Sequence, residues 1–392
     1  FCRKNCFNPT YILTVILLPF RVICICVFLI IAWLLTCVGL YGLSPEDLKT
    51  KPISGWRRNI KNIAALSMRA LFVAGSFNFI KYKGTQASPK EAPILCIAPH
   101  SSYVDAIVVV VMGPPSIVAK AETSKLPFFG KLINFSQPIY VLREDPNSRH
   151  NTIKEIVERA NAKEDWPQVV IFPEGTCTNR SALITFKPGA FYPGVPVQPV
   201  LLRYPNKLDT FTWTWDGPGA LKLLWLTLTQ IHSACEIEFL PVYKPNEEEK
   251  SNPKLYAKNV RDVMAKALGV PISDFTYDDC IIMSVAKDMQ IPHAADIVEI
   301  DRLRKLLKDF AQKLKTSPDD EITTQLFHVL DEVYSLYLNK FKEAVLLLLS
   351  LQKNSGKISL CNFLLCAMFL LKQDEPIIDF LYYVAKVCTC PI

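Results

Sequence analysis

The sequence has no repeat array, no low-complexity tract and no G-x-S-x-G motif. The missing motif speaks against a hydrolase built on a serine nucleophile elbow. The 13 cysteines are scattered, and the C-x-C pairs lack the second pair that a zinc site requires, so we predict neither a disulfide framework nor a metal site. We interpret the cysteines as mostly reduced, buried side chains, which is typical of a chain that faces a reducing compartment.

Hydrophobic residues make up half of the 392-residue chain, a high share for a wholly soluble protein. This share indicates at least one membrane-embedded stretch. The formal net charge of +7 suits anionic lipid surfaces and phosphate-bearing substrates, and it would also suit nucleic acid. Charge alone therefore does not identify a partner.

An apolar run near the start of the chain, residues 11–42, contains one charge, Arg21. Residues 22–42 alone provide the roughly 20 apolar residues that a helix needs to cross a bilayer. We therefore assign residues 1–43 to a membrane anchor. Pro19 and Arg21 divide the run, so a helix-break-helix hairpin lying in one leaflet is the alternative to the single span that we favour.

The basic residues on either side of this run predict its orientation. The flank richer in basic residues tends to stay cytoplasmic. Those after the run are Lys49, Lys51, Arg57, Arg58 and Lys61, and those before it are Arg3 and Lys4. We therefore expect the main domain to face the cytosol.

Beyond the anchor, apolar runs rich in strand-forming residues alternate with helical stretches up to residue 280. This alternation is typical of an α/β domain with a mixed sheet flanked by helices, and we assign residues 44–280 to it. The expected strands are 78–83, 94–98, 116–120, 139–142, 169–172, 197–203 and 235–242, and the expected helices are 59–73, 103–112, 153–162, 221–232 and 255–268. After residue 280 an apolar stripe at helical spacing predicts an all-helical C-terminal domain, residues 281–392.

The expected strand 94–98 ends in the segment P-H-S-S-Y-V-D, residues 99–105. A loop histidine followed five residues later by an aspartate in the first helical turn lets the carboxylate hold one imidazole nitrogen. The other nitrogen is then free to accept a proton. Taken alone, this spacing is also what a His–Asp surface pair would show, so His100 and Asp105 are candidates that need a second feature.

That second feature follows the expected strand 169–172, where P-E-G-T-C-T-N-R occupies residues 173–180. Proline and glycine favour a turn, and one acid, three hydrogen-bonding side chains and an arginine come after it. Arginine offers a bidentate fork to phosphate, and hydroxyls or backbone amides can complete the site. A capped helix start with a surface arginine is the alternative for this segment by itself.

Four ordered blocks make the sequence resemble the glycerolipid acyltransferases, and within them the lysophosphatidylcholine acyltransferase branch. The first is the H-x-x-x-x-D block from His100 to Asp105, whose H-S-S-Y start is similar to that branch. The others are P-I-Y-V-L-R at 138–143, F-P-E-G-T at 172–176 and V-P-V-Q-P at 195–199. Pro99 replaces the asparagine of many members, and Cys177 stands where others place arginine; both departures are similar to the branch.

The resemblance implies a role for each block. It makes His100 and Asp105 the catalytic pair, it associates the second and third blocks with the phosphate-bearing acceptor, and it places the fourth near the substrate tunnel. The binding residues that it implies are Arg143, Glu174, Gly175, Thr176, Arg180, Val195 and Pro196. It implies no metal and no cofactor, because acyl-coenzyme A (acyl-CoA) is a co-substrate.

The reaction that these roles imply is a direct transfer. An acceptor hydroxyl is a poor nucleophile at neutral pH, so His100 would take its proton as it attacks the thioester carbonyl, while Asp105 steadies the imidazolium. Backbone amides near Gly175 or in the 100–105 loop are candidates for stabilising the oxyanion. Cys177 offers an acyl-enzyme route instead, because thiolates are good nucleophiles. We favour direct transfer, which already accounts for the His–Asp pair.

The segment N-S-G-K-I-S, residues 354–359, resembles the middle of an EF-hand loop, a feature that often follows in this branch. Calcium prefers carboxylates at the ligand positions of such a loop. Aligning Gly356 with the loop's invariant glycine puts four other side chains there: Leu351, Lys353, Ser355 and Asn362. We therefore predict degenerate EF-hands that do not bind calcium, with an unrelated helical bundle as the alternative.

We interpret the whole chain as an acyl-CoA:lysophospholipid acyltransferase, with lysophosphatidylcholine as the first-choice acceptor. Lysophosphatidic acid and lysophosphatidylethanolamine are alternative acceptors, and a catalytically silent lipid-binding membrane protein is the alternative from another class. The expected partners are acyl-CoA, a lysophospholipid and the lipid bilayer, with no nucleic acid, and a homodimer is left open. We expect the endoplasmic reticulum membrane, with the Golgi or lipid droplets as alternatives.

Overall fold

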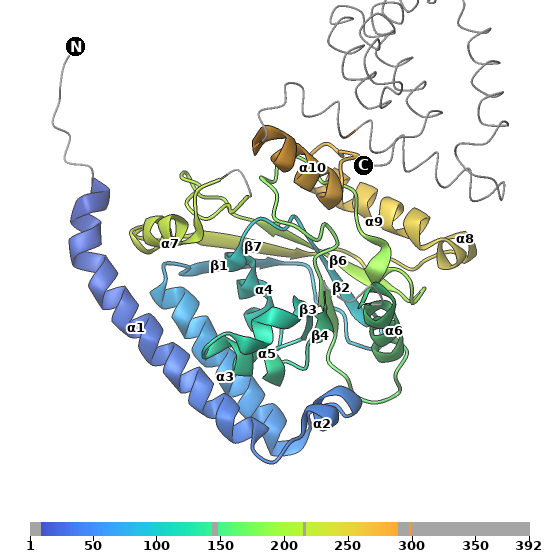
Figure 1. The fold of residues 1–392 in the computed structure, drawn as a ribbon, viewed down its shortest axis with the longest axis horizontal. Coiled ribbons are helices and arrows are strands. Elements are labelled where there is room, and N and C mark those ends of the chain that lie inside the picture. Colours follow the sequence, from blue (N-terminus) through green and yellow to red (C-terminus); the bar gives the residue numbers. More distant parts are fainter. Residues whose placement is uncertain (1–8, 143–147, 215–216, 289–297, 299–392) are drawn as a thin grey trace, which may run out of the picture. The chain divides into compact units, whose positions relative to one another are not determined.

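The computed structural model describes residues 9–142, 148–214, 217–288 and 298 (Figure 1). The chain divides into two compact units, residues 1–277 and 278–392. Apart from α10 (Tyr277–Asp288) and Val298, the predicted C-terminal domain lies outside the described residues, and so does the EF-hand-like segment 354–359. That domain and its boundary stay predictions.

A seven-stranded sheet forms the centre of the first unit, in the order β1-β7-β6-β2-β5-β3-β4. β6 and β7 pair antiparallel and all other neighbours pair parallel, so β1 and β7 run against the other five strands. The strands are β1 (Phe79–Lys83), β2 (Ile94–Ala98), β3 (Ser116–Lys120), β4 (Ile139–Val141), β5 (Val169–Ile171), β6 (Val197–Arg203) and β7 (Ala234–Phe239). The predicted α/β class with a mixed sheet is confirmed.

Strand β2 is buried along its whole length because helices cover both faces of the sheet. Ile94 and Cys96 belong to the core on one face, whereas Leu95 and Ile97 belong to the core on the other. A strand that is covered on both sides reads as a continuous apolar run and does not alternate with polar residues. This explains why the sequence predicts β2 clearly.

Each face of the sheet has its own helices (Figure 1). α6 (Ser148–Ala160) and α9 (Pro253–Leu268) contribute to the core on one face. α3 (Gly55–Ala74) and α4 (Ala106–Val111) contribute to the core on the other. The remaining short helices of this unit are α2 (Pro45–Thr50), α5 (Phe129–Phe135), α7 (Ala220–Leu228) and α8 (Glu247–Ser251).

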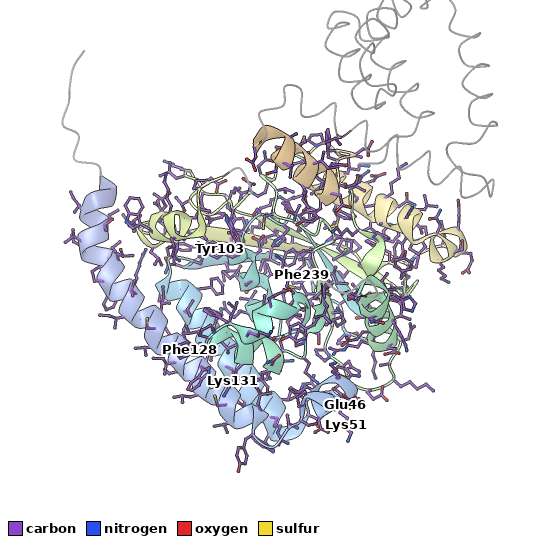
Figure 2. All side chains as sticks on the ribbon, viewed as in Figure 1. Glu46, Lys51, Tyr103, Phe128, Lys131 and Phe239 are labelled. Carbon is purple, nitrogen blue, oxygen red and sulfur yellow. The ribbon has the colours of Figure 1, made fainter. Side chains whose placement is uncertain are left out.

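The predicted membrane anchor forms one helix, α1 (Pro9–Leu40), which continues through Pro19 without a break. Its segment Ile12–Leu40 is long and apolar enough to cross a membrane by length and composition. α1 lies beside α3 and also packs against α5 and α7 (Figure 1). Figure 2 shows Phe128 and Lys131 at this contact, where both lie against the ring of Trp33 in α1.

Arg21, the single charge in this run, is paired with the main domain. Its guanidinium donates to the carbonyls of Leu228, the last residue of α7, and of Gln230 and Ile231 just beyond it. The last carbonyls of a helix carry partial negative charge and lack partners within the helix, so they suit a cation. α7 ends at Leu228, four residues before the predicted end at His232.

The predicted strand bounds are close to those of the structure, whereas helices α3 and α6 begin four and five residues earlier than predicted. β2, β3 and β6 have the predicted bounds, and the other strands differ at their ends by three residues or fewer. The seven described cysteines are all free thiols.

Candidate active site

Three loops that follow neighbouring parallel strands meet at one edge of the sheet. His100 comes after β2, Glu174 comes after β5 and Tyr204 comes directly after β6. β2 pairs parallel with both β5 and β6, so the carboxyl ends of all three strands lie at the same edge. In α/β sheets this edge is where ligands bind.

The predicted catalytic pair is in contact. Nδ1 of His100 lies 2.7 Å from Oδ2 of Asp105, whose side chain is 0% exposed against 24% for the histidine. The backbone amides of Ser101 and Ser102 donate to the same oxygen at 2.6 and 2.9 Å. Asp105 is the last residue of a single 3-10 turn that leads into α4, and Ser102 caps this turn by accepting from the amide of Val104. The short loop and the turn thus hold the carboxylate behind the imidazole.

This arrangement determines what His100 can do. An ionised carboxylate only accepts hydrogen bonds, so Nδ1 carries the proton and Nε2, on the side away from Asp105, has the lone pair. Burial by itself lowers the pKa of His100, but the hydrogen bonds and charges of Asp105 and Cys177 outweigh it and raise the pKa above its ordinary value. Asp105 therefore makes this imidazole a stronger base.

Glu174 supports the histidine loop. Its Oε1 accepts a hydrogen bond from the backbone amide of His100 at 2.8 Å, and its side chain is fully buried. Burial raises the pKa of Glu174 to about 7, although the hydrogen bond from His100 opposes the shift. Next to it, the amide of Thr178 donates to the carbonyl of His100 at 2.7 Å. The carboxylate that was predicted to bind substrate thus contacts the backbone of the loop that carries His100.

The turn after Glu174 requires a glycine. Gly175 has a φ of +69°, and a Cβ at this position would lie 2.9 Å from Cε of Lys187. Both the left-handed backbone and the close lysine disfavour any larger residue. Gly175 is exposed and Thr176 is partly exposed, so this turn faces outward beside the histidine.

Arg180 lies at the same edge and is partly held in place. Its guanidinium pairs with Asp209 and lies over the rings of Tyr204 and Phe211, at 5.4 and 5.3 Å from their centroids. Its Nη1 is buried and has no partner among the described residues. Its backbone has a φ of +66°, a conformation that is uncommon outside glycine and that is often found at functional sites. The unpaired nitrogen leaves the arginine able to bind an anionic oxygen.

Two of the predicted binding residues, Val195 and Pro196, are not brought to this edge. Arg143 lies outside the described residues. Val195 and Pro196 precede β6, and Val197 pairs with Ile94 at the amino end of β2. His100 follows the carboxyl end of β2, so at about 3.3 Å per residue the two places are roughly 25 Å apart along the strands. Val195 and Pro196 could contact only a ligand that extends through the domain.

Cys177 faces His100, with Sγ 3.6 Å from Nε2. The thiol thus contacts the imidazole, and the imidazole contacts the carboxylate of Asp105. An acyl-enzyme route would need this geometry. The same contact also fits a thiol that lines the space where the acceptor hydroxyl must approach.

Replacing Cys177 with alanine separates these two routes. Direct transfer needs no thiol, so we expect kcat to stay within about fivefold of the wild type, the effect of losing one weak hydrogen bond. An acyl-enzyme route predicts loss of all but a trace of transfer. Steady-state rates with radiolabelled acyl-CoA measure this, and denatured wild-type protein should carry no hydroxylamine-labile label.

Two residues of this edge, Tyr204 and Asp209, are absent from the sequence-based site. Tyr204 donates its hydroxyl to Oδ1 of Asp105 at 2.5 Å, and Asp209 pairs with Arg180. Neither stands in a recognisable motif, and each reaches its partner across the fold. Among the described residues, no group of His, Cys, Asp and Glu side chains could hold a metal ion.

Comparison with known proteins identifies the class of this domain. The Acyltransferase family model matches residues 79–203, which run from the first residue of β1 to the last of β6 and include His100, Asp105, Glu174 and Arg180. The chain thus carries an acyltransferase domain, and the histidine, the aspartate and the glycine turn lie within it.

The curated relatives are more specific. The chain is 55% identical over 380 residues to the lysophosphatidylcholine acyltransferase of Drosophila melanogaster. The matched region covers 95% of this chain and 71% of that protein. It is 50% identical to lysophosphatidylcholine acyltransferase 1 of Homo sapiens, over 79% of this chain and 57% of that protein. It is 49% identical to lysophosphatidylcholine acyltransferase 2 of Homo sapiens, over 76% of this chain and 54% of that protein. The chain belongs to the lysophosphatidylcholine acyltransferase family.

The chain spans just over half the length of the two human relatives. Among solved structures, the 1-acyl-sn-glycerophosphate acyltransferase PlsC of Thermotoga maritima covers 64% of this chain and 96% of its own, with 17% identity and a TM-score of 0.38. A likeness at that level does not bear on the function.

Proposed function

We propose that this chain transfers a fatty acyl group from acyl-CoA to the free hydroxyl of lysophosphatidylcholine, with His100 as the general base. The observation that carries the proposal is the oriented pair of His100 and Asp105 beside an exposed glycine turn. Membership of the lysophosphatidylcholine acyltransferase family supports the choice of reaction and of acceptor. Lysophosphatidic acid and lysophosphatidylethanolamine are the alternative acceptors.

In this mechanism His100 moves one proton. Nε2 takes the proton of the acceptor hydroxyl as the oxygen attacks the thioester carbon, and the charge of Asp105 stabilises the resulting imidazolium. The tetrahedral intermediate then collapses, the carbon–sulfur bond breaks, and the same proton passes from the imidazolium to the sulfur of coenzyme A. An ester bond replaces a thioester bond, and no other reactant is needed.

The hydrogen bonds of the site narrow the choice of oxyanion donors. The amides of His100, Ser101 and Ser102 already donate to Glu174 or Asp105, and the amide of Gly175 donates to the carbonyl of Phe172. The amides of Thr176 and Cys177 donate no hydrogen bond within the described part of the chain. We therefore assign these two amides to the oxyanion, since donors that are not already paired can bind a developing negative charge.

The membrane would supply the acceptor to this site. α1 exposes large apolar side chains such as Val15, Phe20 and Ile23 along its outer face, which suits a helix in contact with lipid. We propose the endoplasmic reticulum membrane with the catalytic domain toward the cytosol, and the Golgi or lipid droplets as alternatives. The basic residues that follow α1 support this orientation.

An acceptor panel tests the proposed function. Purified protein in detergent is given a long-chain acyl-CoA or acetyl-CoA together with each of the three lysophospholipids, and the labelled phospholipid is measured. We expect phosphatidylcholine to form fastest. Product with another acceptor alone would change the substrate assignment, and no product with any acceptor would favour a silent lipid-binding protein.

Replacing Arg180 with alanine should act on the acceptor. Losing a charged, forked hydrogen bond to phosphate costs a factor of about 10 to 100, so we expect the acceptor KM to rise by that amount while the KM for acyl-CoA stays close to wild type. Arg180→Lys, which keeps the charge but not the fork, should fall in between. Arg58→Ala serves as the control, because Arg58 is an exposed arginine on α3 that pairs with Asp165. An unchanged acceptor KM in Arg180→Ala would rule out this role.

A further inference from the structure

Tyr204 lies directly behind the catalytic pair. It is the first residue after β6, and its ring packs against Phe77 and Phe211 at centroid distances of 6.2 and 4.4 Å. Its hydroxyl donates to Oδ1 of Asp105 at 2.5 Å. Burial and the charge of Asp105 raise the pKa of this phenol well above its ordinary value, so the group remains a donor.

The two oxygens of Asp105 have different partners. Oδ2 accepts hydrogen bonds from the ring nitrogen of His100 and from the backbone amides of Ser101 and Ser102. Within the described residues, Oδ1 accepts a hydrogen bond from the hydroxyl of Tyr204 alone. Hydrogen bonds to both oxygens hold a fully buried carboxylate in one orientation and compensate for its lost contact with water. The tyrosine hydroxyl therefore completes the set that keeps Oδ2 directed at the histidine.

The ring of the same tyrosine supports a second component of the site. The guanidinium of Arg180 lies over Tyr204 and Phe211, and its other contact is the ion pair with Asp209. A cation over an aromatic face is attracted to it and loses freedom of orientation. Tyr204 thus touches both the aspartate behind the base and the arginine assigned to the acceptor.

We propose that Tyr204 is a positioning residue with two separable parts: its hydroxyl orients Asp105 behind His100, and its ring supports Arg180 for the acceptor phosphate. The proposal rests on the proposed function. It assigns the hydroxyl to the chemical step and the ring to acceptor binding, so the two parts have different kinetic signatures.

The variant Tyr204→Phe removes the hydroxyl and keeps the ring. We expect kcat to fall by about 10- to 100-fold, the effect of losing a hydrogen bond to a charged group, with the acceptor KM unchanged. The matched control is Tyr243→Phe. Tyr243 also donates to a carboxylate, Glu249 at 2.6 Å, but it pairs with Val197 at the opposite edge of the sheet. The control should keep the wild-type kcat.

The variant Tyr204→Leu removes the ring as well. We expect it to show the loss in kcat together with a higher acceptor KM, because the guanidinium of Arg180 loses one of its two aromatic supports. An acceptor KM equal to that of Tyr204→Phe would remove the ring from the proposal.

A double-mutant cycle shows whether the hydroxyl acts through Asp105. In an Asp105→Ala background the hydroxyl has no carboxylate to orient, so adding Tyr204→Phe should lower kcat no further. Losses that multiply would mean an independent, structural effect and would overturn the proposal. So would a Tyr204→Phe protein that unfolds while Tyr243→Phe melts like wild type, or one that keeps full kcat. If wild type itself transfers no acyl group, it is the proposed function that fails.

Discussion

Replacing His100 with alanine lowers kcat by about 10²- to 10⁴-fold, the usual contribution of a general base, and leaves the binding of acyl-CoA close to wild type. The reason is that the contact with Asp105 holds His100 in the tautomer whose Nε2 accepts a proton. Steady-state rates of phospholipid formation measure the loss, and circular dichroism checks the fold.

A second histidine provides the control for this experiment. His150 is exposed on α6 and belongs to no part of the site, so His150→Ala should keep wild-type rates. A His100→Ala protein that folds normally and retains more than a tenth of wild-type kcat would be incompatible with a base at this position.

Replacing Asp105 with asparagine removes the charge behind the imidazole and largely keeps the geometry. The amides of Ser101 and Ser102 both point at Oδ2, so the oxygen of the new side chain should occupy that place and still accept from Nδ1. We therefore expect the tautomer to survive and kcat/KM to fall by about 10²- to 10⁴-fold, because the imidazolium formed during transfer loses its counter-charge.

The same variant should change the pH dependence. A histidine can act as a base only when it is unprotonated, and the hydrogen bonds and charges around His100 raise its pKa in the wild type. If His100 is the base, wild-type kcat/KM should therefore increase with pH through the neutral range. Without the charge of Asp105 that pKa falls, and the acidic limb of the profile should move to lower pH. A limb at the same pH in both proteins would mean that another group controls it.

The parts of the site that the sequence predicts are those encoded locally. His100 and Asp105 stand five residues apart on one loop and one turn, so their contact requires no knowledge of the fold. β2 can be predicted for a similar reason, because a strand covered on both faces is a continuous apolar run in the sequence. The turn at Gly175 follows from its own residue types, since its backbone is left-handed.

The parts that the sequence misses depend on contacts between distant residues. Tyr204 meets Asp105 across 99 positions, and Arg180 meets Asp209 across 29. Nothing in the local pattern of a tyrosine after a strand indicates such a partner. Val195 and Pro196 show the opposite error, because the sequence places them near the site and the structure does not. They precede β6, so they lie at the edge of the sheet opposite His100.

The release of coenzyme A by purified wild-type protein, with and without lysophosphatidylcholine, most directly tests direct transfer from acyl-CoA to the acceptor. The account predicts that the free thiol appears only when the acceptor is present, at the same rate as phosphatidylcholine forms. Thiol release at an equal rate without the acceptor would contradict it, because the acyl group would then be passing to water or to the enzyme itself.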